Sequence, residues 1–170
     1  EASRPEGRPA LVDVSGRLRG ILHPQGNIET LAVIHKLASW TLSRGRNVHT
    51  AEHGWLRVTA SPLPESQRLQ LQAAKGLCEQ HPVPGLVPVL TIEQPESGGS
   101  EIFSKNAGAQ TLRQYVESHE PLGVTGLVIV EQVARILADF QKHIGYHLGI
   151  CPENILVNER SDGSPTISLL

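Results

Sequence analysis

The chain has 170 residues, of which 39% are hydrophobic, and this is a usual size for one folded domain. Fifteen lysines and arginines stand against 17 aspartates and glutamates, so the net charge is −2 and no sequence-wide cationic field favours nucleic acid. The apolar runs are far shorter than the ~20 residues that cross a bilayer, and there are only two cysteines. We therefore expect no nucleic-acid partner, no membrane insertion and a reducing, cytoplasmic location.

The first part of the chain predicts a tail, a sheet and one helix. Residues 1–10 are polar and hold two prolines, and residues 1–30 are assigned to an N-terminal extension. Apolar stretches at 31–34, 40–42 and 55–60 alternate with turn-forming residues at 44–47 and 52–54, which predicts an antiparallel meander. A helix is expected from about Ser66 to Gln80, with Leu69, Ala73 and Leu77 on its apolar face.

The second part predicts two more strands, two helices and a hairpin. The strands are expected within 81–92 and 101–103, and a short helix at 111–116. A long helix should cover about 125–144, with Gly145 as its stop. Its expected core stripe consists of Leu127, Val130, Val133, Ala134, Leu137, Phe140 and Ile144. A turn at 160–163 should join strands at 155–157 and 166–170, so the predicted fold class is α+β.

The segment after the long helix carries the most specific pattern. Residues 145–157 are Gly-Tyr-His-Leu-Gly-Ile-Cys-Pro-Glu-Asn-Ile-Leu-Val. This segment resembles the catalytic loop of the protein-kinase superfamily, H-R-D-[LI]-K-P-x-N-[IL]-L-[VI], with matches at His147, Ile150, Pro152, Asn154, Ile155, Leu156 and Val157. Residues 81–90 are similar to the segment before the fourth kinase strand, and residues 102–116 to the hinge strand and its following helix.

The resemblance extends over about residues 31–170 and implies a two-lobed arrangement. Residues 31–103 would form the antiparallel-sheet N-lobe with one helix, and residues 104–170 the first helices and the catalytic-loop hairpin of a helical C-lobe. The metal-binding D-F-G triplet would begin just after Leu170. Because the chain also lacks methionine, we expect it to be a fragment of a larger protein.

Phosphoryl transfer depends on positioning and electrostatics, so each missing charged residue removes a function. By the resemblance, Ser61 stands at the position of the phosphate-binding lysine, and Gln72 at that of its glutamate partner. Leu148 replaces the arginine of the catalytic loop, Gly149 its proton-accepting aspartate and Cys151 its lysine. Gly45 is the only glycine where the phosphate loop is expected, so no catalytic residue and no cofactor are predicted.

Two motif residues are retained, His147 and Asn154. The resemblance would make Asn154 a metal ligand, but without the aspartate we expect its amide to bond backbone groups and brace the loop, and His147 to be structural. A zinc site is an alternative, built from His143, His147, Cys151, Cys78 and His81. The spacing disfavours zinc, because the helix should end before His147 and no metal-binding motif is present.

These observations favour a pseudokinase: a kinase-like domain without phosphotransfer that binds a protein partner, or other domains of the same signalling protein, as a regulatory module. The first alternative is an atypical nucleotide-dependent transferase with a remodelled kinase-like pocket. A second is a structural adaptor that uses the fold as a rigid spacer.

Overall fold

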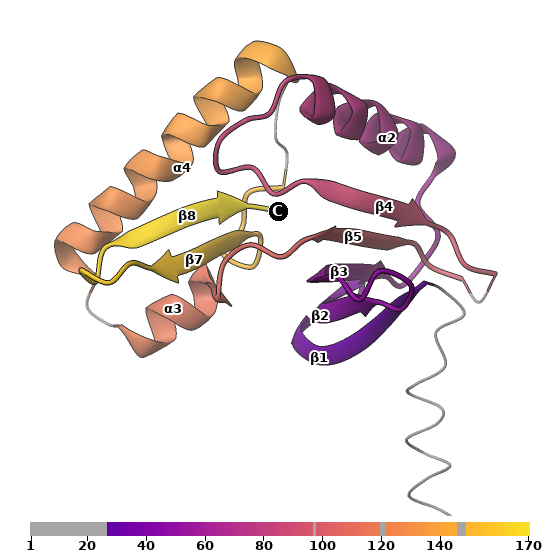
Figure 1. Cartoon of the computed structure of the whole chain (residues 1–170), viewed down its shortest axis with the longest axis horizontal. Helices are drawn as coiled ribbons and strands as arrows, with labels where there is room; N and C mark the ends of the chain where they lie inside the picture. Colours follow the sequence, from indigo (N-terminus) through magenta and orange to yellow (C-terminus); the bar gives the residue numbers. More distant parts are fainter. Residues whose placement is uncertain (1–26, 97, 120–121, 146–148) are drawn as a thin grey trace, which may run out of the picture.

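The structure is a computed structural model that describes residues 27–96, 98–119, 122–145 and 149–170. A larger antiparallel sheet has the strand order β1-β2-β3-β5-β4 (Figure 1). Its strands are β1 (Ile28–Lys36), β2 (Trp40–Asn47), β3 (His53–Thr59), β4 (Val89–Glu93) and β5 (Glu101–Lys105). Helix α2 (Glu65–Gln80) lies between β3 and β4 in the chain, so the predicted meander and helix are confirmed.

The rest of the described chain forms a helical part around a smaller sheet with the order β6-β7-β8. Its elements are β6 (Gln110–Thr111), α3 (Leu112–Ser118), α4 (Gly123–His143), β7 (Ile155–Glu159) and β8 (Pro165–Leu169). The predicted hairpin at the end of the chain is confirmed, whereas the two-residue strand β6 was not predicted. The α+β class is confirmed as well.

The turn between β2 and β3 falls later than the sequence predicts. The expectation of a turn at 44–47 is wrong, because these residues complete β2. The chain reverses after Asn47, whose Oδ1 accepts hydrogen bonds from the backbone N–H groups of His49 (2.9 Å) and Thr50 (3.1 Å). A Cβ on Gly45 would lie only 3.0 Å from Ile28 Cγ2, so this glycine marks close strand packing rather than a turn.

The sheet also begins earlier than the expected boundary between residues 30 and 31. Ile28 is the first residue of β1, and its side chain is buried against Leu56 and Phe103. Burying this side chain helps to hold the N-terminal end of β1 on the sheet. Residues 1–26 lie outside the described residues.

The two long helices bury different amounts of apolar surface. Helix α2 has no buried residue, and Leu69 and Leu77 of its expected apolar face are exposed. Helix α4 packs on β8 through Ile129, Ile136 and Phe140. The expected α4 stripe is therefore wrong at Leu127, Val130 and Ala134, which are exposed. The helix is apolar on two faces, and its periodicity alone does not show which of them meets the sheet.

The segment between α2 and β4 ties the two sheets together. Leu169 N–H donates to the carbonyl of Gly85 (2.7 Å), and Val87 N–H donates to the carbonyl of Leu169 (2.7 Å). Gly85 has φ +86°, and a Cβ there would lie 2.5 Å from Ile136 Cδ1, so no larger residue fits between this segment and α4. The sheet of β1–β5 and the helical part are thus joined by backbone bonds as well as by side chains.

Candidate functional site

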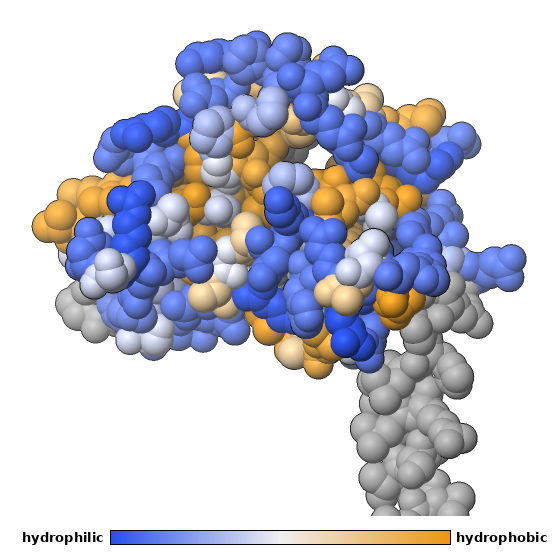
Figure 2. Space-filling model, in the orientation of Figure 1, coloured by the Kyte–Doolittle hydropathy of each residue, from blue (hydrophilic) through white to orange (hydrophobic). Residues whose placement is uncertain are grey.

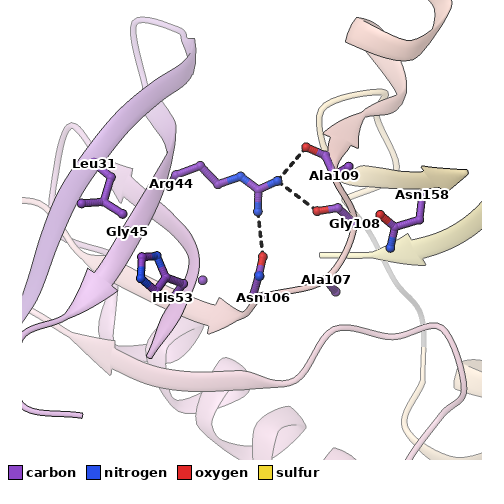
Figure 3. Close-up of a pocket in the computed structure, with 10 residues that line it drawn as sticks. Leu31, Arg44, Gly45, His53, Asn106, Ala107, Gly108, Ala109 and Asn158 are labelled. Atoms are coloured by element: carbon purple, nitrogen blue, oxygen red, sulfur yellow. Dashed lines mark hydrogen bonds between the residues drawn. The ribbon is translucent and has the colours of Figure 1, made fainter. Parts of the chain in front are cut away.

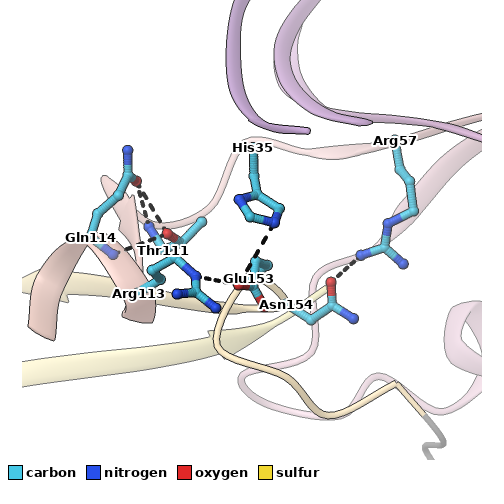
Figure 4. A network of polar contacts seen from close by, with 7 residues as sticks. All are labelled: His35, Arg57, Thr111, Arg113, Gln114, Glu153 and Asn154. Carbon is cyan, nitrogen blue, oxygen red and sulfur yellow. Dashed lines mark hydrogen bonds and ion pairs between the residues drawn. The ribbon is translucent and has the colours of Figure 1, made fainter. Parts of the chain in front are cut away.

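The loop of residues 149–154 meets β1, β3 and α3 in a polar network between the two sheets (Figure 4). Asn154 is buried at its centre and uses all four of its polar groups. Its Oδ1 accepts from Arg57 Nη2, and its Nδ2 donates to the Gly149 carbonyl at 2.5 Å. Its backbone N–H donates to the Cys151 carbonyl (2.9 Å), and its own carbonyl accepts from Leu170 N–H (2.8 Å). The amide nitrogen thus bonds a backbone carbonyl of the loop, as expected, whereas the amide oxygen bonds a side chain of β3.

Arg57 is the cation that reaches this loop from the larger sheet. It lies on β3, its guanidinium carbon is 5.1 Å from the centre of the Trp40 ring, and burial lowers its pKa. Its Nε is buried and has no hydrogen-bond partner among the described residues. The hydrogen bond to Asn154 and the contact with the Trp40 ring therefore replace most of the hydration that the guanidinium loses on burial.

Glu153 forms the second half of the network. It is only 5% exposed, and Arg113 Nε donates to its Oε1, while His35 Nε2 lies 3.8 Å from the same oxygen. Burial acts to raise the pKa of Glu153, but hydrogen bonds from Arg113, the backbone and Cys151 outweigh it and hold the pKa below its ordinary value. The carboxylate thus stays ionised and links β1 to α3.

Helix α3 holds Arg113 in place through its N-terminal cap. Thr111 and Gln114 form a capping box, in which the Thr111 hydroxyl accepts from Gln114 N–H (3.3 Å) and Gln114 Oε1 accepts from Thr111 N–H (3.0 Å). Arg113 N–H also faces the Pro152 carbonyl at 3.4 Å. The cap therefore fixes the start of α3 directly beside the loop that it contacts.

Trp55 fills the space between the larger sheet and the connection that follows β5. Its side chain is 1% exposed and packs with Leu42, Val87 and Leu156. Its indole Nε1–H donates to the Ala107 carbonyl at 2.7 Å. The next residue along the chain, Gly108, lies against the core too, because a Cβ there would meet Leu156 Cβ at 2.5 Å. The buried Trp55 ring thus lies against the core side of the connection at 106–109.

The structure gathers only some of the residues that the sequence singles out. Gly149, Cys151 and Asn154 share the loop, whereas His147 lies outside the described residues. Ser61 is exposed beyond the end of β3, and Gln72 is exposed on α2, so neither belongs to the network. Sequence reasoning missed Arg57, Glu153 and Trp55. The signal for Arg57 was an arginine between the apolar residues Leu56 and Val58 of an expected strand, where a cation needs a partner.

Two residues of the alternative zinc site, His81 and His143, lie in contact, but they are not joined by further metal ligands among the described residues. His81 and His143 stack with their ring centres 5.5 Å apart, although they come from different segments. Within the described ranges, no group of three histidine, cysteine or acidic side chains is placed to hold a metal. Asn154 Oδ1, the other candidate metal ligand, already accepts a hydrogen bond from Arg57.

No protein-family model matches the chain, and no curated protein matches it significantly. Among the helices of the described residues, none combines the length and apolar character that a membrane crossing requires.

Proposed function

We propose that the chain is a pseudokinase domain, a kinase-like fold without phosphotransfer that serves as a protein-binding, regulatory module of a larger signalling protein. The element order supports this. Three antiparallel strands, a helix and two further strands are followed by a connection, two helices, a loop and a hairpin, which is the order that the resemblance implies. The five-stranded sheet and three described helices are compatible with such a fragment.

The observation that carries the proposal is the buried indole of Trp55. A nucleotide held between the lobes needs an open space there, and Trp55 fills the space beside Leu42, Val87 and Leu156, on the core side of the connection at 106–109. Its N–H also donates to the Ala107 carbonyl, so this backbone acceptor is no longer free to bond a nucleotide base. Opening this space would cost the burial of the largest side chain in the core.

The polar network supports the same proposal. Gly149 has no side chain that could accept the proton of a substrate hydroxyl. Arg57 is the β3 cation that faces the loop, and it bonds Asn154 rather than an open space. Asn154, the retained motif residue of this loop, therefore bonds the β3 cation and holds the loop against the sheet.

Exposed apolar side chains support the protein-binding role. Val124, Leu127 and Val130 are 77%, 72% and 66% exposed and lie along one face of α4. Hydrophobic atoms gather at the left edge of the molecule, where α4 begins (Figure 2). A row of exposed apolar residues at helical spacing is typical of a surface that another protein covers.

A thermal-shift titration with ATP and Mg²⁺ tests the loss of phosphotransfer. Ligand binding raises the melting temperature, so we expect no magnesium-dependent rise with this protein. A rise that EDTA reverses would contradict the proposal and favour the nucleotide-dependent transferase.

The binding role is tested with Leu127→Lys in the full-length protein, with Gln141→Lys on the same helix as control. Loss of an identified partner with both variants, or with neither, would contradict the assigned surface.

A further inference from the structure

A pocket of about 550 Å³ opens between β2, β3 and the connection at 106–109 (Figure 3). This volume is within the range of about 300–1,000 Å³ that small-molecule sites usually have. Arg44, His53, Asn106 and Asn158 supply polar side chains to its wall, and Gly45 and Gly54 also line it. None of these side chains belongs to the network around Asn154.

Arg44 is the one lysine or arginine among the residues that line the pocket. Its guanidinium carbon lies 3.7 Å from the centre of the Trp55 ring, so one face of the cation covers the indole. Trp55 itself does not line the pocket, which places Arg44 between the indole and the open space. The other face of the guanidinium plane is therefore available to a ligand.

The edges of the guanidinium are already held in place. Nη1 donates to Asn106 Oδ1 (2.8 Å), and Nη2 donates to the carbonyls of Gly108 (2.9 Å) and Ala109 (2.7 Å). These bonds fix the plane before any ligand arrives, so little entropy is lost on binding. They also direct an incoming group to the face of the cation rather than to its edge.

The charge of Arg44 has no anionic partner. All three of its acceptors are neutral, and no ion pair of the described residues includes it. No acidic side chain lines the pocket. Burial lowers the pKa of Arg44, because its three neutral acceptors bring no negative charge to the partly desolvated cation. An anion bound in the pocket would neutralise the charge of Arg44.

We propose that this pocket binds a small organic anion with a planar, unsaturated body that stacks on the open face of Arg44. A planar group matches the guanidinium, which stacks on flat π-systems as a lysine cannot. The negative charge matches a wall that holds one fixed cation and no carboxylate. This inference goes beyond the proposed function, because it needs neither nucleotide nor magnesium.

The test is an NMR titration with sodium benzoate, observed at the indole N–H signals of the two tryptophans. Trp55 should shift in a saturable way, because its ring lies under Arg44, while Trp40 should not. Benzamide, which is planar and neutral, and cyclohexanecarboxylate, which is charged and not planar, are the matched probes. We expect both to bind about tenfold more weakly than benzoate.

Asn158 supplies the matched variants, because it lines the pocket, is exposed, and its side chain makes no hydrogen bond among the described residues. Asn158→Asp adds a negative charge at constant size and should weaken benzoate binding about tenfold, while Asn158→Gln should leave it within about twofold. Equal affinity for benzoate and benzamide would overturn the proposal. So would an unchanged affinity in Asn158→Asp, or no saturable shift of Trp55 in millimolar benzoate. None of these outcomes depends on the ATP titration.

Discussion

Two arginine–tryptophan pairs lie where the larger sheet faces the rest of the chain, and they differ in what surrounds the arginine. Arg44 lies 3.7 Å from the centre of the buried Trp55 ring, bonds three neutral acceptors and borders an open pocket. Arg57 lies 5.1 Å from the partly exposed Trp40 ring and bonds Asn154 in the loop that resembles a catalytic loop. We therefore expect the tryptophan to contribute more to stability in the first pair, and the arginine in the second.

The largest effect on the free energy of unfolding should come from Trp55, with Trp40 as the comparison. Trp55→Ala removes a core side chain and leaves a cavity beside Leu42 and Leu156, so we expect a loss of about 3–5 kcal/mol in the free energy of unfolding. Trp40→Ala removes a partly exposed ring and should cost about 1 kcal/mol. Urea unfolding measures both. Equal losses would show that the two pairs do not differ as described.

The second effect concerns the bond between Arg57 and Asn154. Arg57→Met leaves Asn154 Oδ1 unpaired, and Asn154→Ala leaves the buried guanidinium without its acceptor, so each should cost about 2–3 kcal/mol. A double-mutant cycle should give a coupling of about 1–2 kcal/mol, because each single change already removes the same bond. Ser61→Ala serves as control, since Ser61 is exposed outside the network. Additive losses would contradict the bond.

The sequence predicted elements better than it predicted partners. The α4 helix follows from its apolar spacing, but its buried face does not, because Leu127 and Ile129 are equally apolar and only β8 distinguishes them. Asn154 was found because a motif surrounds it. Arg57 and Trp55 were missed because their partners, Asn154 and Ala107, lie far along the chain. Ser61 was assigned by counting from a motif, and the strand ends before that residue.

The third effect is a dependence on pH. The pKa of Glu153 is depressed in the folded state, so its ion pair stabilises the protein above the pKa of the unfolded chain, about 4.3, and this contribution is lost as the pH falls through the folded pKa. Because Arg113 is half exposed and screened by water, we expect about 1 kcal/mol. Glu153→Gln should remove that much at pH 7 and flatten the unfolding free energy below pH 4.5. An unchanged acid slope in Glu153→Gln would contradict the assignment.

The smallest effect should come from replacing each arginine by lysine, which keeps the charge and removes the planar fork. At Arg44 the pocket admits water to the freed carbonyls of Gly108 and Ala109, so Arg44→Lys should cost less than about 1 kcal/mol. At Arg57 no pocket adjoins the lost bond, and a buried ammonium is harder to desolvate than a guanidinium, so Arg57→Lys should cost about 2 kcal/mol. Urea unfolding of the two variants side by side measures the difference. If Arg44→Lys proved the more costly change, the guanidinium of Arg44 would be a structural clamp like that of Arg57, and its open face would have no role in holding a ligand.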